Sequence, residues 1–500
     1  MNIIIRVDAS IHIGSGHVMR CLVLAEALKE KNYSVSFVCR SQAGDMINFI
    51  QERGFDIISL DEIIPAIQPK KSADYLAWLQ CPIEKDANDF LSRINKADIV
   101  VTDHYVIGKE WQSIVREKLN CRIVAIDDLE RGHDADLVLD QTLGRTKQSY
   151  PDIKCVLAGS EYALLNPNFS ILREQAYGRL APQKVIKVLV SMGGIDSPNA
   201  TLAVLEQLAT LDNIEVTVLL SPRAPHYVSV NNFCQNKANI RKVDFISNMA
   251  KTMLEHDVAI GAPGTTSWER ACLGLPSIII PLAVNQLAIS KALVDAQAAI
   301  LVELDAIEDH LSESFQSLLM AWPSYYQANL KICDGLGLYR FLFEIDSLLD
   351  KSKKKYRLEK AMKDDIELVY QWQCHPETRK YALNSAPPSW EEHEKWMQKK
   401  IENGYQDYFY LVKNIAYNKR VGVVRLDRIR DGEYLISIFV APDFHGKGIG
   451  LFTVKMLNVL HPQITIRATV LEGNKASQQL FKKAKYHKIS ADEFIRYPVK

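Results

Sequence analysis

The chain has 500 residues, of which 47% are hydrophobic and 24% are charged, values of ordinary globular proteins that exclude a fibrous or disordered chain. At roughly 100 to 200 residues per domain, this length predicts about three domains. Lys and Arg together number 60, as do Asp and Glu. With no net charge there is no global field to attract nucleic acid or an anionic membrane, so any phosphate must be held by a local site.

The cysteines and the N-terminus bear on the cellular compartment. Nine cysteines are scattered singly without a C-x-x-C pair, which argues against a disulfide framework and favours a reducing cytosol. The segment Met1–Asp8 is a short strand-like run without the features of a signal peptide. No apolar run reaches the roughly 18 residues of a membrane-spanning helix. We therefore expect a cytoplasmic protein with no membrane or nucleic-acid partner, and the sequence predicts no particular oligomeric state.

Apolar, strand-like runs alternate with helical segments in the first two thirds of the chain. The first series comprises residues Ile3–Val7, Ser34–Cys39, Ile99–Thr102, Arg122–Ile126 and Asp136–Leu139. After a polar stretch at 178–184 the pattern restarts with Val185–Ser191, Ile214–Leu220, Val258–Gly261 and Pro276–Pro281. This alternation predicts two tandem Rossmann-like parallel sheets of the α/β class. Because ligands of such sheets bind at the carboxyl ends of the strands, we expect a substrate in the cleft between the two halves.

The domain boundaries follow from these patterns. We expect one Rossmann-like domain at residues 1–170, a second at 171–349, and an α+β domain at 357–500. The lysine-rich run between them predicts a solvated linker at 350–356, since one short basic run in a neutral protein is usually a surface feature and not a nucleic-acid-binding arm.

A glycine turn joins the first predicted strand to a helix. It contains Gly14, Gly16, His17 and Arg20. Glycines let the backbone approach a ligand closely, and the free N–H groups of the first helical turn favour anions. His17 and Arg20 are therefore predicted to flank a pocket of diphosphate size. In the alternative interpretation His17 only caps or packs the turn.

The second half repeats this arrangement. Gly193 and Gly194 directly follow a strand, where successive N–H groups can form an anion-binding nest. Thr265 and Thr266 begin a helix after another strand and offer hydroxyls to phosphate, while Glu269 can accept both hydroxyls of a ribose. A cap with a dipole-complementing acid is the alternative, but it does not explain glycine motifs in both halves.

Taken together, motifs across residues 1–345 resemble the UDP-sugar hydrolases of pseudaminic acid biosynthesis. They are Asp8, Gly14-x-Gly16-His17-x-x-Arg20, Asp103-His104-Tyr105, Ile126-Asp127-Asp128, Gly159–Leu165, Ser191–Asp196 and Gly264–Glu269, with Asn285-Gln286. The resemblance implies a fold similar to GT-B glycosyltransferases and removal of UDP from UDP-2,4-diacetamido-2,4,6-trideoxy-β-L-altropyranose, with water as the acceptor. His17 would take the proton from water, and Tyr105 and Asn285 match positions near the sugar.

Two further expectations concern this site. Asp8 is the candidate to orient His17. No metal is predicted, because the acidic and histidine clusters at 103–104 and 127–128 lack H-E-x-x-H or a comparable ligand pattern, and Asp often follows buried strands as a turn former.

A second glycine-rich loop lies in the last domain, between a strand at Glu433–Val440 and an apolar helix at Leu451–Leu460. The loop resembles the pyrophosphate loop of GNAT-type N-acetyltransferases, whose pattern is R/Q-x-x-G-x-G/A. The predicted strand Ile464–Leu471 and helix Ala476–Lys485 match the family's next elements. The resemblance implies acetyl-CoA as co-substrate, held by Val440, His445, Gly446, Lys447, Gly448, Ile449, Gly450 and Asn474. An ordinary glycine turn is the alternative.

The acid and base of the acetyltransferase are less well defined. Phe481 stands where many such enzymes carry a tyrosine that protonates the CoA thiolate, so the general acid is unassigned. Glu433 and Glu472 are candidates for the base by position. A helical set could hold a nucleotide sugar, although core packing is the more common role of its tryptophans; the set is Trp372, Arg379, Glu392, His393 and Trp396.

The combined prediction is a bifunctional enzyme. It would N-acetylate a UDP-4-amino-4,6-dideoxy sugar with acetyl-CoA and then hydrolyse UDP-2,4-diacetamido-2,4,6-trideoxy-β-L-altropyranose without a metal. The alternatives are a GT-B glycosyltransferase with an appended acyltransferase, an enzyme of a related nonulosonic acid pathway acting on another sugar isomer, and a binding module without turnover.

Overall fold

The computed structural model describes residues 1–70, 74–350 and 355–499 and shows two compact units, Met1–Leu342 and Phe343–Lys500. Both predicted Rossmann-like halves belong to the first unit. Residues 351–354 of the predicted linker lie outside the described residues. The predicted boundary at 170/171 falls within α6 (Pro167–Ala176), so the division of the first unit at that position stays a prediction.

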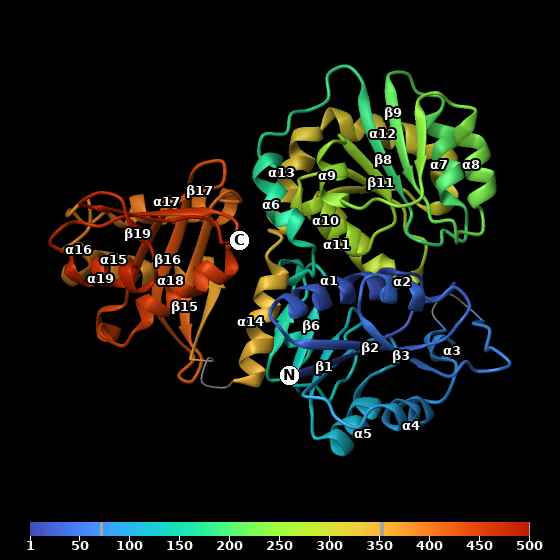
Figure 1. The fold of residues 1–500 in the computed structure, drawn as a ribbon. Coiled ribbons are helices and arrows are strands. Elements are labelled where there is room, and N and C mark those ends of the chain that lie inside the picture. Colours follow the sequence, from blue (N-terminus) through green and yellow to red (C-terminus); the bar gives the residue numbers. More distant parts are fainter. Residues whose placement is uncertain (71–73, 351–354, 500) are drawn as a thin grey trace. The chain divides into compact units, whose positions relative to one another are not determined.

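The first Rossmann sheet is parallel, in the order β3-β2-β1-β4-β5-β6-β7. Its strands are β1 (Asn2–Val7), β2 (Ser34–Arg40), β3 (Asp56–Leu60), β4 (Ile99–Asp103), β5 (Arg122–Ile126), β6 (Leu137–Asp140) and β7 (Val156–Ala158). Helices α1 (Gly16–Glu30) and α2 (Ile47–Glu52) cover one face, and α4 (Ile83–Arg93) and α5 (Lys109–Leu119) the other (Figure 1). A sheet covered on both faces explains why its strands read as continuous apolar runs.

The second Rossmann sheet is also parallel, in the order β10-β9-β8-β11-β12-β13. Its strands are β8 (Ile186–Ser191), β9 (Ile214–Leu219), β10 (Ile240–Val243), β11 (Val258–Gly261), β12 (Ser277–Ile279) and β13 (Ala299–Leu301). The helices are α7 (Ala200–Leu208), α8 (Tyr227–Gln235), α9 (Met249–Leu254), α10 (Thr265–Cys272), α11 (Leu287–Asp295), α12 (Ile307–Met320) and α13 (Trp322–Ile332). They are followed by α14 (Gly337–Leu349), within which the division between the two units falls. Helix α6 packs on α9 and α10, so this segment joins the core of the second half.

The strand order places the ligand-binding edge of each sheet. In the first sheet β1 lies between β2 and β4, and in the second β8 lies between β9 and β11. The direction of winding reverses at these points, and the loops after the strands diverge there to leave a crevice. The loops that follow β1, β4, β8 and β11 carry the predicted glycine, histidine and threonine motifs, so the topology brings these motifs to the crevices.

The second unit contains a mixed sheet in the order β14-β15-β16-β17-β18-β20-β19. Its strands are β14 (Tyr356–Lys360), β15 (Tyr408–Asn414), β16 (Lys419–Arg430), β17 (Glu433–Val440), β18 (Thr465–Thr469), β19 (His487–Lys488) and β20 (Glu493–Arg496). The helices are α15 (Ile366–Cys374), α16 (Pro376–Arg379), α17 (Trp390–Asn403), α18 (Ile449–Leu460) and α19 (Lys475–Lys483).

Strands β17 and β18 are parallel neighbours that separate along their length. Their pairing covers only Glu433–Leu435 against Thr465–Arg467, although β17 continues to Val440. The carboxyl-terminal part of β17 therefore has backbone groups on this side that do not pair with β18, next to the start of the glycine-rich loop.

The predicted fold class is confirmed: two parallel Rossmann-like sheets precede a mixed α+β sheet. Among the described residues, every helix is too short or too polar to span a bilayer.

Candidate functional site

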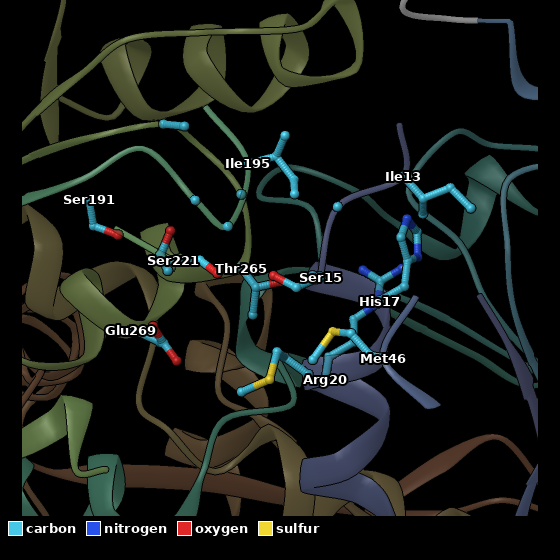
Figure 2. A pocket seen from close by; sticks show the side chains of 18 of the residues that line it. Ile13, Ser15, His17, Arg20, Met46, Ser191, Ile195, Ser221, Thr265 and Glu269 are labelled. Atoms are coloured by element: carbon cyan, nitrogen blue, oxygen red, sulfur yellow. The ribbon is translucent and has the colours of Figure 1, made fainter. Parts of the chain in front are cut away.

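One large cavity lies between the two Rossmann halves of the first unit, with a volume of about 1210 Å³. This is room for a nucleotide sugar, since small-molecule sites usually measure about 300 to 1,000 Å³. The cavity brings together all the residues predicted for the sugar-nucleotide site, namely Gly14, Gly16, His17, Arg20, Tyr105, Gly193, Gly194, Thr265, Thr266, Glu269 and Asn285. Figure 2 shows His17 and Arg20 from the first half and Thr265 and Glu269 from the second among its lining side chains.

The glycine loops of the two halves approach each other at the cavity. A Cβ atom built on Gly194 would lie 2.8 Å from the Oγ atom of Ser15, too close for any larger residue without movement. Gly14 and Gly193 have φ angles of +78° and +91°, which residues with a side chain rarely adopt. The backbone amides of both loops can therefore come near one bound anion.

His17 is held by a carboxylate. Its Nδ1 atom lies 2.6 Å from Oδ1 of Asp103, the last residue of β4, and 3.2 Å from Nη2 of Arg20. Burial would raise the pKa of Asp103, but the charge of Arg20 and the contact with His17 lower it far below its usual range. The ionised carboxylate can only accept, so the shorter contact places the proton on Nδ1 of His17. Nε2, which bonds no described residue, then has a lone pair for a proton.

The expectation that Asp8 orients His17 is wrong. Oδ1 of Asp8 accepts from Nη1 of Arg6 at 2.5 Å and from the backbone N–H of Arg40 at 2.7 Å. Asp8 is thus bound within the buried core that joins β1 to β2. Asp103 takes the orienting position because β4 is paired with β1 in the sheet.

Arg20 lines the cavity, but its guanidinium group is already occupied. Nε and Nη2 donate to the two oxygens of Asp103 at 2.7 and 2.6 Å, and Nη1 donates to Asp128 at 2.8 Å. This buried fork keeps Asp103 ionised and in place. Its predicted role in binding substrate stays a prediction, while the geometry gives it a role in positioning His17 through Asp103.

Tyr105 stands beside the imidazole of His17. The two rings meet edge to face with centroids 4.6 Å apart, and the Tyr105 hydroxyl lies 3.2 Å from Asp128 and 3.4 Å from Nδ2 of Asn285 in the other half. Burial, together with the Asp128 carboxylate, raises the pKa of Tyr105, so its phenol remains protonated. Trp78 stacks against Tyr105 with ring centroids 5.8 Å apart and adds an aromatic wall.

In the second half, α10 presents its N-terminus to the cavity, with Thr265 as its first residue after the N-cap Gly264. Glu269 lies one turn further along the helix. Burial raises the pKa of Glu269 to about 7, and the charge of Arg270 opposes this shift only in part. Glu269 can therefore change its protonation state near neutral pH.

Several cavity residues were not singled out from the sequence. Gln141 follows β6, Trp78 comes from α3 (Tyr75–Leu79), and residues 244–250 follow β10. Their common signal is their place after a parallel strand, but strand order, which the sequence does not reveal, decides which of these loops meet. Among the described residues, no group of three or more His, Cys, Asp or Glu side chains could hold a metal ion.

The glycine-rich loop of the second unit connects β17 to α18 as expected. Gly446 and Gly448 have φ angles of +74° and +77°, and a Cβ atom on either would meet open space. Gly448 is the N-cap of α18, so the loop presents free helical N–H groups. Nε2 of His445 donates to the carbonyl of Val440 at 3.0 Å, which ties the loop back to its strand. A cradle of this kind suits a pyrophosphate.

The other residues predicted for acetyl-CoA extend this loop. Lys447 donates through Nζ to the carbonyl of Asp443 at 3.1 Å, and Ile449 and Gly450 form the first turn of α18. Oδ1 of Asn474 accepts from the N–H of Ser477 and caps α19. A contact of these residues with the co-substrate stays a prediction.

Of the two candidate bases, Glu433 is bound in ion pairs. Burial would raise its pKa, but Arg430, at 2.6 Å, and Arg467 lower it. A carboxylate held by two arginines is a weak base, so the geometry disfavours Glu433 in this role. Glu472 is exposed. Phe481 packs in the core against Tyr486.

The helical set predicted to pack or to bind a nucleotide sugar packs the unit. Arg379 donates to the backbone carbonyls of Gln373, Asn384 and Ala386. The ring of His393 bonds to Gln373 and to the carbonyl of Ile366. These bonds order the segment between α16 and α17.

Comparisons with known proteins agree with this architecture. Residues 355–487 match the acetyltransferase (GNAT) domain, and residues 188–332 match the glycosyltransferase family 28 C-terminal domain. An uncharacterized protein of Methanocaldococcus jannaschii is 25% identical over 513 residues, covering 98% of this chain and 97% of its own length. The calicheamicin glycosyltransferase CalG4 superimposes on 70% of this chain and 98% of its own with a TM-score of 0.51 and 12% identity, which shows a shared GT-B-like fold.

A relative of known activity matches about half of the chain. The UDP-2,4-diacetamido-2,4,6-trideoxy-beta-L-altropyranose hydrolase of Campylobacter jejuni is 26% identical over 267 residues, 52% of this chain and 84% of that protein. The class is therefore a GT-B-like sugar-nucleotide enzyme. The particular chain is a fusion of such an enzyme, homologous to this hydrolase over half its length, with a C-terminal GNAT acetyltransferase domain, which implies the use of acetyl-CoA.

Proposed function

We propose that the first unit hydrolyses UDP-2,4-diacetamido-2,4,6-trideoxy-β-L-altropyranose to the free sugar and UDP, and that the second unit performs the preceding N-acetylation of a UDP-4-amino-4,6-dideoxy sugar. Both reactions would serve pseudaminic acid biosynthesis. The observation that carries the hydrolase proposal is the contact of His17 with Asp103, which leaves Nε2 of His17 as a base in the cavity. The identity of the proposed substrate is taken from the distant hydrolase relative.

In the proposed hydrolysis, the oxygen of a water molecule attacks the anomeric carbon while Nε2 of His17 takes one of its protons. The bond from the anomeric carbon to the diphosphate oxygen breaks, and UDP leaves with the electron pair. The negative charge of Asp103 stabilises the imidazolium that forms, as a buried carboxylate does in other His-based sites.

The leaving diphosphate would be held without a metal. The backbone amides of Gly193 and Gly194, the Thr265 hydroxyl and the N-terminus of α10 all reach the cavity. Fixed donors that face a departing anion stabilise it more than water does, because they need not reorient. Treatment with EDTA is therefore expected to leave hydrolysis unchanged.

For the acetyltransferase, bound acetyl-CoA supplies an acetyl thioester. The residues that would hold it are those of the loop from Val440 to Gly450, with Asn474 nearby in sequence at the start of α19. The open space at Gly446 and Gly448 and the free amides of α18 fit a pyrophosphate. On the side that faces β18, the carboxyl-terminal part of β17 offers N–H and C=O groups to an extended ligand, as a sheet edge does.

Mass spectrometry of the products tests the proposal. The full chain receives the UDP-2-acetamido-4-amino-2,4,6-trideoxy sugar with or without acetyl-CoA. With acetyl-CoA we expect gain of one acetyl group followed by release of UDP and the free diacetamido sugar. His17→Ala is expected to accumulate the acetylated nucleotide sugar. Release of UDP only after an acceptor alcohol is added, with the sugar recovered as a glycoside, would favour a GT-B glycosyltransferase. Turnover of another sugar isomer only would favour a related nonulosonic acid pathway.

A further inference from the structure

A buried glutamine links the two Rossmann halves at the cavity. Gln141 directly follows β6 in the first half, is 2% exposed and lines the cavity. Its Nε2 donates to Oγ1 of Thr265, in the second half, at 3.1 Å. Its Oε1 accepts from the backbone N–H of Leu164 at 3.2 Å. Both ends of the amide are thus engaged.

These bonds fix the direction of the Thr265 hydroxyl. The N–H of Leu164 can only donate, so the oxygen of the Gln141 amide must face it and the NH₂ group must face Thr265. Oγ1 of Thr265 then accepts from Gln141. A hydroxyl carries one proton and two acceptor sites, so its proton is left for another partner. Oγ1 donates no hydrogen bond to the described part of the chain.

The position of Thr265 indicates what that partner is. Thr265 is the first residue of α10, whose N-terminus opens into the cavity. Free amides and the helix dipole at this point favour an anion, and a phosphate oxygen accepts hydrogen bonds only. If the Thr265 hydroxyl could rotate and donate to another acceptor, its hydrogen bond to the phosphate oxygen would be formed for only part of the time.

We propose that Gln141 is a positioning residue that aims the Thr265 hydroxyl at the diphosphate of the nucleotide sugar. This inference rests on the proposed function, because it needs a diphosphate at α10. Since Gln141 belongs to the first half and Thr265 to the second, binding of the diphosphate then depends on the hydrogen bond between the two halves.

The test is a double-mutant cycle on UDP binding, measured by calorimetry with the full chain. Gln141→Met keeps the length of the side chain and removes both amide bonds. We expect it to weaken UDP binding about tenfold, which corresponds to about 1.4 kcal/mol. Thr265→Val is expected to cause a similar loss. In the Thr265→Val background, Gln141→Met should cause no further loss, because its effect passes through the hydroxyl.

A matched control separates positioning from stability. Gln112 is fully buried in the first half, donates to Oγ1 of Thr102 at 3.0 Å and does not line the cavity. Gln112→Met removes a bond of the same kind. We expect it to lower the Tm while UDP affinity stays unchanged. If Gln141→Met does not fold, Gln141→Asn, whose shorter amide cannot make both bonds, carries the same expectation.

The outcomes are distinguishable. Unchanged UDP affinity in the Gln141 variant, or equal losses in both backgrounds, would overturn the positioning role while leaving the hydrolase proposal intact. A wild-type chain that bound no UDP would overturn both. Equal loss of UDP affinity in the Gln112 variant would assign the effect to the stability of the first half and refute the inference.

Discussion

Replacing Asp103 by Asn tests the geometry of the hydrolase site most sharply. The two side chains have nearly the same shape, but the amide has no charge and can present an N–H group to Nδ1 of His17. Nδ1 would then accept, and the ring proton would move to Nε2, where the base is needed. General-base catalysis typically contributes about 10²- to 10⁴-fold. We therefore expect kcat for UDP release to fall by about that range, or about 2.7 to 5.4 kcal/mol in the barrier.

The same substitution also affects stability. Asp103 is buried and accepts two hydrogen bonds from Arg20. In the Asp103→Asn variant, Asp128 is the one ionised partner that Arg20 retains among the two. Losing one partner of a buried pair can cost about 3 to 5 kcal/mol, and the remaining carboxylate should hold the loss below that range. Asp128→Asn is the matched control, because it removes a charge from the same arginine without touching His17. The assay compares kcat for UDP release at a temperature where thermal denaturation shows both variants folded. Equal kcat losses in the two variants would refute the orienting role of Asp103.

Other predictions address each site separately. Gly448→Trp is expected to abolish acetyl transfer and spare UDP release, because an indole would fill the space predicted for the pyrophosphate. The φ of +77° at this position also costs a residue with a side chain about 1 to 2 kcal/mol. Retained acetylation would show that the loop is misassigned. Glu433→Gln should keep acetyl transfer but lower the Tm at neutral pH. Arg430 and Arg467 lower the pKa of this carboxylate in the folded state, so the Tm difference between the variant and the wild type should shrink as pH falls through that pKa. Loss of acetyl transfer in a variant as stable as the wild type would instead support Glu433 as the base. Burial raises the pKa of Glu269 to about 7, and its ionised form is predicted to accept two ribose hydroxyls, so affinity for a UDP-sugar should fall as pH drops below about 7. The measurement is calorimetry with a UDP-sugar, because the terminal phosphate of free UDP itself titrates near pKa 6. An equal pH dependence of affinity in Glu269→Gln would exclude Glu269 as the titrating group.

Local sequence patterns predicted the elements that carry the sites. Strand Glu433–Val440 is observed at those bounds, because it is a run of mostly aliphatic and aromatic residues that ends at a proline-containing loop. The glycine turn after the first strand begins α1 as expected. Strands β3 (Asp56–Leu60) and β13 (Ala299–Leu301) were not predicted. Both are edge strands and only partly buried, so they do not show the continuous apolar runs of the central strands.

The partners of the site residues depended on strand order. Asp8 follows β1 and Asp103 ends β4, and the sequence offered no means to decide which of them reaches His17. The sheet places β4 next to β1, so Asp103 reaches His17 while Asp8 pairs with Arg6. The bond from Gln141 to Thr265 joins residues 124 positions apart across the cavity, which no local pattern reveals.

Hydrolysis in water enriched in ¹⁸O tests the central claim, that water attacks the anomeric carbon. The measurement is the isotopic composition of the released UDP, because the free sugar can exchange its anomeric oxygen with the solvent. The account predicts UDP without ¹⁸O, released at a rate that does not require an added acceptor. UDP carrying ¹⁸O would show attack at phosphorus and would contradict the account.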